Sequence, residues 1–470
     1  MRLKASLLSL VFTSLVFARL SSAQKIDWPK VNEELLRHYQ ALIRIDTTDP
    51  PGNETKAAEY VQHALASEGI PVTLAAKDPT RANLIARLKG NGSKRPILLM
   101  AHLDTVQVDA SKWTIPPFSA ELKDGYIYGR GTEDNKWQVA AGLMTMLLLK
   151  RNNVALDRDV IFAAEAGEEA ATGPGIEHLV NDHWQDIDAE ACIAESGGVV
   201  RSNGQVRYAL VETAEKLPKG ARLVAHGPSG HGSRPMRTSA ILHLSTAIEK
   251  VATWDPPMRF NDTTRTYFEK LATIGTPAEA ARYNGLFSPV KAAASREYLA
   301  EHDPSKYSML HTSISPDIIS GGFQINVIPS QAEATLDIRA LPDEDMPAFY
   351  ALMRKMINDP AVELIPESKN QRPAAPPSRI DSDVYHAIEA SNRKIYQIPT
   401  IPTMSTGASD MAFLRAKGMQ CYGVGPIVDE EDAAKGFAAH SDQERLREDA
   451  LYKFMEFQWD VLTTVAMSKK

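Results

Sequence analysis

Cysteine is scarce in this 470-residue chain, which contains only Cys192 and Cys421. Two cysteines can form at most one disulfide, so a hydrophobic core must hold the fold together. Cys192 lies in the apolar run 191–194, which favours buried free thiols, although an oxidising compartment would permit a disulfide between the two cysteines. Hydrophobic residues make up 43% of the chain, enough for roughly two or three domains.

Runs of basic residues are absent. The chain has 52 Lys and Arg residues against 59 Asp and Glu residues, which gives a formal net charge of −7. Proteins that bind nucleic acids or anionic membranes depend on concentrated positive charge. The sequence therefore argues against nucleic-acid and membrane-surface partners.

Long apolar runs are also absent, except near the N-terminus. Arg2 and Lys4 precede a mostly apolar stretch at 5–18, and small residues follow up to Ala23. This stretch is shorter than the about 20 residues of a transmembrane helix, and the pattern is typical of a secretory signal peptide. We expect residues 1–23 to be a signal peptide cleaved after Ala23. The mature chain would then have no membrane span and would be secreted or periplasmic.

Two types of sequence pattern alternate along the remaining chain. Helical and strand-like runs alternate up to residue 215 and again after a proline-rich stretch at 367–377, as in a mostly parallel sheet covered by helices. Between them, residues 332–339 alternate strictly between apolar and polar, as in an antiparallel strand with one wet face. Residues 254–306 indicate a helical insertion or a long loop. We predict an α/β fold in which residues 24–215 and 378–470 form one discontinuous domain and residues 216–377 form an inserted α+β domain.

Three apolar strands each lead to polar side chains that could bind a metal. His102 follows the first strand, Glu168 and Glu169 follow the second, and Glu195 follows the third. Parallel strands bring their carboxyl ends to one edge of a sheet, where open α/β folds bind ligands. Each feature alone could be a turn histidine or an acidic loop. Their combination favours a metal site, because adjacent carboxylates repel one another unless a cation or proton intervenes.

Three further residues extend this set. Asp104, two residues after His102, could accept the imidazole N–H and fix its tautomer. Asp134 lies in the segment GRGTEDNK (129–136) before an apolar helix, where it could bind a metal, cap the helix or do both. His440, in a loop near the C-terminus, supplies a second histidine.

With these residues in this order, the sequence resembles the dizinc aminoacylase and carboxypeptidase superfamily, which includes glutamate carboxypeptidase, succinyl-diaminopimelate desuccinylase and carboxypeptidase S. The resemblance extends from about Ile43 to Glu444. The motif W-x-x-PPF within it is closest to carboxypeptidase S-like members. The segments that carry it are AHLDTV (101–106), WTIPPFSAELKDGYIYGRGTEDNK (113–136), the Glu168-Glu169 pair, GHGSRP (230–235), NVIP (326–329), LDIRALP (336–342) and AHSDQE (439–444). It implies a zinc-exopeptidase-like catalytic domain and an inserted lid domain through which the chain could form a homodimer.

The resemblance also implies two zinc ions. Asp134 would bridge them, His102 and Glu195 would complete one site, and Glu169 and His440 would complete the other. Histidine nitrogen and carboxylate oxygen are ordinary zinc ligands. Cobalt and manganese also suit such a donor set.

The resemblance implies that Glu168 is the general base. It also implies a catalytic role for Asp104, the residue that could accept the imidazole N–H of His102. His231 would stabilise the tetrahedral oxyanion, commonly from a dimer partner. The residues that would contact substrate are Arg339 and Asn326, which match lid residues for the carboxylate and carbonyl, and Gly407 and Ser409, which border the pocket.

These features predict a secreted dizinc hydrolase that cleaves a peptide or N-acyl amino acid bond beside a free carboxylate. An aminopeptidase is the first alternative, but the cation of Arg339 would repel a substrate amine. An inactive peptide-binding protein is the second, but the five predicted ligands and the base are all present. The sequence does not specify the preferred side chain or acyl group.

Overall fold

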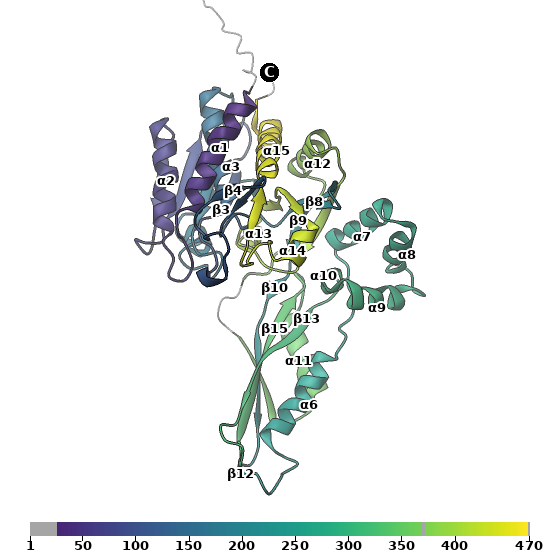
Figure 1. Ribbon diagram of the computed structural model, residues 1–470. Helices are drawn as coiled ribbons and strands as arrows, with labels where there is room; N and C mark the ends of the chain where they lie inside the picture. The colour runs from purple at the N-terminus through teal and green to yellow at the C-terminus, as the bar shows by residue number, and fades with distance from the viewer. Residues whose placement is uncertain (1–25, 368–371, 469–470) are drawn as a thin grey trace, which may run out of the picture.

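The computed structural model describes residues 26–367 and 372–468, so the predicted signal peptide lies outside the described residues. Figure 1 shows two parts, which we call the arm (residues 217–252 and 313–366) and the body (the other described residues). A ten-stranded sheet organises the body and a five-stranded sheet organises the arm. Among the described residues, no helix combines the length and the apolar character needed to cross a membrane.

The centre of the large sheet is parallel. Strand β3 (Ile97–His102) lies between β6 (Val160–Glu165) and β7 (Ala191–Ala194) and runs parallel to both, and β18 (Gln420–Gly423) continues this order beyond β7. All residues of β3, β6 and β7 are buried, as their continuous apolar runs predicted. The remaining strands are β1 (Val72–Ala75), β2 (Asn83–Leu88), β8 (Gly198–Ser202), β9 (Gln205–Glu215), β17 (Thr400–Ser405) and β19 (Ile427–Asp429). This sheet confirms the predicted α/β class.

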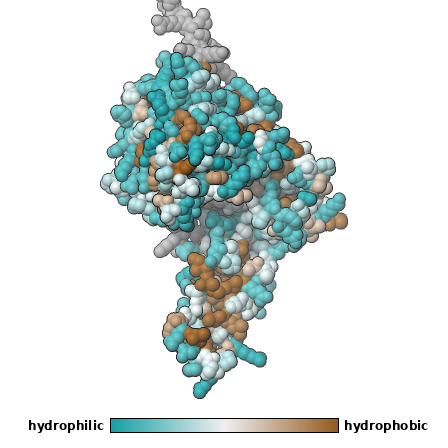
Figure 2. Space-filling model, viewed as in Figure 1, coloured by the Kyte–Doolittle hydropathy of each residue, from teal (hydrophilic) through white to brown (hydrophobic). Residues whose placement is uncertain are grey.

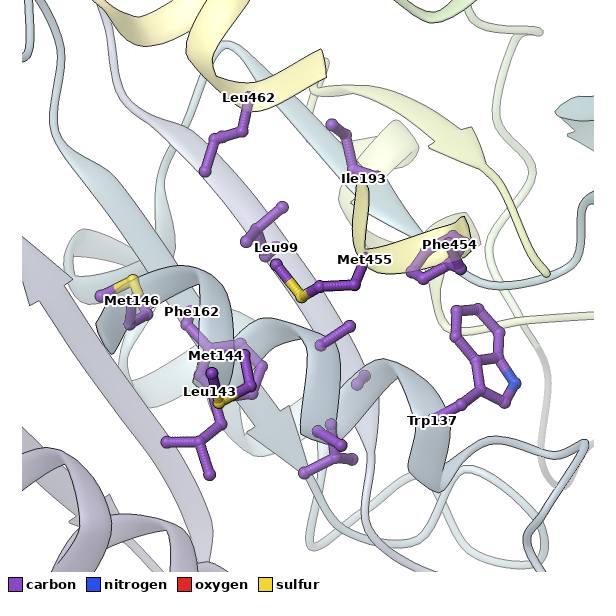
Figure 3. Close-up of a cluster of buried hydrophobic side chains, with 14 of the residues drawn as sticks. Leu99, Trp137, Leu143, Met144, Met146, Phe162, Ile193, Phe454, Met455 and Leu462 are labelled. Carbon is purple, nitrogen blue, oxygen red and sulfur yellow. The ribbon is translucent and has the colours of Figure 1, made fainter. Parts of the chain in front are cut away.

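Helices cover both faces of the sheet. Helix α3 (Lys136–Arg151) packs on β3 between α1 (Trp28–Ile43) and α15 (Glu448–Ala466), which explains why it is apolar all round. Figure 3 shows side chains of α3 and α15 gathered over Leu99 in the core. The opposite face is covered by α4 (Ile176–Asp182), α5 (Trp184–Ile187) and α13 (Met411–Ala416). Further body helices are α2 (Glu54–Ser67), α12 (Asp383–Ile395), α14 (Glu430–Lys435) and the 3₁₀ turn η1 (Ala110–Lys112).

A three-stranded sheet joins two distant segments of the body. It consists of β4 (Glu121–Lys123), β5 (Tyr126–Tyr128) and β20 (Arg445–Arg447), with Tyr128 opposite Arg445. This pairing places the loop after β5 beside the loop before β20. These loops carry Asp134 and His440.

The arm is an antiparallel sheet with helices on one face. Its strands are β10 (Leu217–Pro218), β11 (Ala221–His226), β13 (Ser313–Gly321), β15 (Gln331–Ala340) and β16 (Val362–Pro366). Helices α6 (Ala240–Ala252) and α11 (Met346–Ile357) pack on the sheet, and the alternate residues of β15 face them, as predicted. A small ribbon of β12 (Gly230–His231) and β14 (Val327–Ile328) ends the arm, and Figure 1 shows β12 far from the body.

Residues 254–306 form helices that leave the arm and pack on the body. These helices are α7 (Asp262–Ile274), α8 (Pro277–Gly285), α9 (Ala292–His302) and α10 (Pro304–Ser308). Phe268 and Leu271 of α7 share a core with Ile401 and Met404. Of the two alternatives predicted from the sequence, the helical insertion is therefore the correct one.

Cys192 and Cys421 are free and fully buried on neighbouring parallel strands. Buried free thiols are what the apolar run around Cys192 favoured.

Candidate metal centre and active site

The predicted ligands meet at the carboxyl edge of the large sheet. His102 is the last residue of β3, Glu169 lies in the loop after β6, and Glu195 follows β7 directly. The loops before α3 and β20 bring Asp134 and His440 to the same edge. Five residues from five separate segments therefore converge, as the parallel order of β3, β6 and β7 requires.

These residues form two clusters that share Asp134. One cluster consists of His102, Asp134 and Glu195, the other of Asp134, Glu169 and His440, and in each the ligand atoms lie within 4.8 Å of one another. Asp134 Oδ1 lies 2.9 Å from His102 Nε2, and Asp134 Oδ2 lies 3.2 Å from His440 Nε2. The two oxygens of one carboxylate thus face two different histidines, which is the arrangement of a bridging ligand.

The charges of the site favour cations. Burial raises the pKa of Glu169 to about 7 and, with the neighbouring carboxylates Glu195 and Asp410, holds the pKa of Glu168 well above its ordinary value. Hydrogen bonds to Asp134 and Glu169 raise the pKa of His440 to about 10. So many carboxylates at one edge repel one another unless protons or cations lie between them. The nitrogen and oxygen donors therefore fit two divalent cations.

Asp134 is held by its main chain and does not cap the helix. The N-cap position of α3 is Asn135, whose Nδ2 donates to the Glu195 carboxylate. The Asp134 N–H donates to Glu444 Oε1 at 3.1 Å, and the Glu133 N–H donates to the same oxygen at 2.6 Å. The capping alternative is therefore not realised, and the Asp134 side chain is left for the two histidines.

Glu444 also ties this loop to the loop of His440. Its Oε2 accepts from Arg130 Nη1 at 2.6 Å, and Arg130 Nη2 donates to the Ser441 carbonyl at 3.0 Å. Both Glu444 and Arg130 are buried. The sequence places these two residues within motifs, but no local pattern indicates that they pair with each other.

Asp104 acts differently from the prediction. The His102 Nδ1 atom lies 3.0 Å from the main-chain oxygen of Asp104 but 3.5 Å from its Oδ1 atom, too far for a good hydrogen bond. The carboxylate oxygens instead accept from the N–H groups of Glu168 at 3.1 Å and Glu169 at 3.0 Å. The carbonyl of Asp104 thus orients the imidazole, and its carboxylate orients the acidic pair.

A hollow of about 500 Å³ opens beside the clusters. Glu168, Glu169 and His440 line it from the body, and Arg339 of β15 lines it from the arm. Arg339 Nε donates to both oxygens of Asp337, at 3.0 and 2.9 Å. Its two terminal nitrogens donate no hydrogen bond within the described part of the chain, so they could receive a substrate carboxylate.

The four remaining predicted residues belong neither to the two clusters nor to the lining of this hollow. His231 and Asn326 are exposed at the end of the arm, where the Asn326 carbonyl accepts from the Gly232 N–H at 2.8 Å. Ser409 is buried, and its N–H and hydroxyl donate to Glu215 Oε2. Gly407 is exposed, and Ala408 between them is the member of that loop that lines the hollow.

Arg372 is a residue of the hollow that sequence reasoning missed. Its Nη2 atom donates to Glu168 Oε1 at 2.9 Å and lies 3.4 Å from Asp410 Oδ1. Residues 367–377 read as a linker, and one arginine among prolines carried no signal of this contact.

Comparisons with known proteins agree with this geometry. The model of peptidase family M20/M25/M40 matches residues 98–463. The N-fatty-acyl-amino acid synthase/hydrolase PM20D1 of Xenopus tropicalis is 28% identical over 373 residues, which cover 77% of this chain and 71% of that protein. The probable carboxypeptidase S-like 2 of Dictyostelium discoideum is 28% identical over 320 residues, which cover 66% of this chain and 60% of that protein.

A similar fold occurs in a solved structure. The crystal structure of the M20 family metallo-carboxypeptidase Sso-CP2 from Sulfolobus solfataricus has a TM-score of 0.69 and 20% sequence identity. The match covers 92% of this chain and 99% of that chain. The arrangement of body and arm is thus that of a known fold.

Proposed function

Because the chain belongs to peptidase family M20/M25/M40, and so is a metallopeptidase or amidohydrolase, we propose that it is a two-metal enzyme that cleaves a peptide or N-acyl amino acid bond beside a free carboxylate. The observation that carries this proposal is the shared carboxylate of Asp134, whose oxygens face His102 and His440. A single metal site would not need a carboxylate directed at two histidines.

The proposed ligands follow the two clusters. His102 and Glu195 hold one ion, Glu169 and His440 hold the other, and Asp134 contacts both. Bound divalent ions would lower the pKa of a water molecule and stabilise negative charge that develops on the substrate carbonyl. Zinc suits these ligands best, and cobalt or manganese could replace it.

Glu168 is the proposed general base. It lies next to the ligand Glu169, lines the hollow, and is held by Asp104 through its N–H and by Arg372 through Oε1. Within the described chain, Oε2 accepts no hydrogen bond, so it can take the proton of the attacking water. It would then pass this proton to the leaving nitrogen.

Arg339 is the proposed contact for the substrate carboxylate, because its two free terminal nitrogens could donate to both oxygens. The name of the X. tropicalis relative, which refers to N-fatty-acyl-amino acids, supports an N-acyl amino acid as the substrate class. Such a substrate has the free carboxylate that Arg339 requires.

We also propose a homodimer through the arm, in which His231 and Asn326 serve the active site of a second copy. Figure 2 shows a hydrophobic area on the arm. Exposed apolar side chains there include Ile318, Ile319, Phe323 and Ile325 near the unpaired edge of β13, with Ile241 and Leu242 on α6. An apolar strand edge of this kind favours pairing with another chain.

The domain division of the proposal follows the sequence patterns. Residues 24–215 and 378–470 form the catalytic domain, residues 216–377 form the lid, and residues 1–23 direct secretion or export to the periplasm. The helices at 262–308 belong to the lid in sequence but pack on the body, so they join the two parts.

A matched substrate panel tests the function. Purified protein loaded with zinc is assayed against N-acyl amino acids and dipeptides, each with a free and an amidated C-terminus. We expect hydrolysis of the free acids only, and none by Asp134→Ala prepared in the same way, which controls for contaminating hydrolases. Equal hydrolysis of amidated substrates, or a requirement for a free amine, would replace this proposal with the aminopeptidase alternative.

A further inference from the structure

Arg372 lies where the chain returns from the arm to the body. Its side chain is 11% exposed, and its main-chain oxygen accepts from Lys219 Nζ at 3.0 Å. Lys219 directly follows β10, where the chain enters the arm. Two of the connections between body and arm, the first and the last along the chain, therefore meet at Arg372, on the wall of the proposed active site.

The guanidinium of Arg372 holds Glu168 at two points. Nη2 donates to Glu168 Oε1 at 2.9 Å and to the Glu168 main-chain oxygen at 3.2 Å. A glutamate side chain has three rotatable bonds. Because one nitrogen holds both the main-chain oxygen and the carboxylate of Glu168, the contact restricts rotation about all three bonds. The contact occupies Oε1 and leaves Oε2, the oxygen proposed to take the proton.

The carboxylates around Glu168 share the guanidinium of Arg372. Asp410 is 1% exposed and both of its carboxylate oxygens lack hydrogen bonds, while Glu165, equally buried, has one unpaired oxygen. Among the described residues, Arg372 is the cation that lies within 4.0 Å of Glu168 or Asp410. A guanidinium shared by these two carboxylates has a fixed position, which is what a positioning residue requires.

We propose that Arg372 is a positioning residue for the general base: it holds Glu168 through Oε1 and the main-chain oxygen, and so leaves Oε2 to take a proton from the attacking water. This inference rests on the proposed function, which gives Glu168 its role. It adds a residue outside the resemblance motifs, and it links the orientation of the base to the junction through which the arm is attached.

Loss of this contact should lower turnover more than binding. Misplacement of a reacting group by about 1 Å can cost about 100-fold in rate. We expect Arg372→Ala to lower kcat by about 10- to 100-fold with little change in KM and with both metals retained. Arg372→Lys should recover part of the loss, because an ammonium keeps the positive charge but sits on a shorter side chain than the guanidinium.

A double-mutant cycle separates positioning from other roles. If Arg372 acts through Glu168, then Arg372→Ala should cost almost nothing further in a Glu168→Gln background. Arg379→Ala is the matched control, because Arg379 lies just after the same connection and, within the described residues, its side chain hydrogen-bonds to the exposed Asp381 alone. This control should keep wild-type kcat and KM.

Each other outcome overturns the inference. A raised KM with unchanged kcat would make Arg372 a substrate contact, and loss of metal or an additive loss in the Glu168→Gln background would make it structural. If Arg372→Ala does not fold, Arg372→Lys keeps the buried charge and must show reduced kcat at unchanged KM. A Glu168→Gln enzyme with nearly wild-type turnover would refute the proposed function itself, whereas normal kcat in Arg372→Ala with an inactive Glu168→Gln refutes this inference alone.

Discussion

The metal edge of the body and the outer end of the arm carry residues of one predicted active site, but the fold holds them in opposite ways. Asp104 and Glu444 at the metal edge are fully buried, and each binds the main chain of ligand loops. At the end of the arm, His231 is exposed and its side chain bonds only to Ser233. The residues at the metal edge are all supplied by one chain. The residues at the end of the arm can act only if the arm moves or a second chain supplies them.

The largest expected effect lies at the metal edge. Asp134→Ala should lose both ions and all measurable turnover, because one carboxylate serves both clusters. Metal analysis after dialysis against excess zinc measures the loss. The control is Asp109→Ala, because Asp109 is exposed, caps η1 and pairs with the exposed Lys112. Saturation of the wild type at one ion per chain would contradict the two-metal proposal.

The next largest effect should distinguish the roles of the adjacent residues Glu168 and Glu169. Glu168→Gln should keep both metals but lose turnover by about 10²- to 10⁴-fold, since only the base is removed. Glu169→Gln should lose metal as well. Equal metal loss in the two variants would show that the roles of Glu168 and Glu169 are assigned wrongly.

The arm is tested by a mixing experiment. His231→Ala should lower kcat by about 10²- to 10³-fold if it stabilises the oxyanion. Refolding it together with Glu168→Gln should restore activity, because a mixed dimer contains one site with an intact base and a histidine from the other copy. If no activity returns although mixed dimers form, His231 does not act between chains.

Replacement of Arg339 should have a smaller effect, which concerns substrate binding. Arg339→Ala should raise KM for free-acid substrates by about 10- to 100-fold, the value of a charge-assisted hydrogen bond of about 1.5 to 3 kcal/mol. Amidated substrates should be poor for the wild type and hardly worse for the variant. An equal loss for both substrate forms would make Arg339 structural.

The last effect concerns the stability of the fold and not the activity. His311 precedes β13 and is buried, and burial together with the charge of Lys216 lowers its pKa to about 4. The unfolded chain binds a proton near pH 6.5, so stability should fall by about 2 to 3 kcal/mol as pH drops from 6.5 to 4. Urea unfolding should show a weaker pH dependence in His311→Gln than in the wild type. An identical slope in both proteins would contradict a neutral His311.

The positions of His102 and Glu195 could be predicted from the sequence because apolar runs mark where buried strands end. The bridging position of Asp134 needed the family resemblance, since no periodicity indicates which way a loop carboxylate points. The contact of Arg372 with Glu168 joins residues 204 positions apart, and no local pattern encodes it. The packing of α7 on β17 was missed for the same reason.

The order of the strands has a consequence for synthesis on the ribosome. The strand β18 fills the place between β7 and β9, and α15 packs against α3, although both come from the last part of the chain. The arm comes from two middle stretches, residues 217–252 and 313–366, which precede the final strand of the body. His440 and Glu444 emerge later still. A chain that ends before residue 440 therefore lacks one of the five proposed metal donors, His440, and also Glu444, which holds the loop of Asp134.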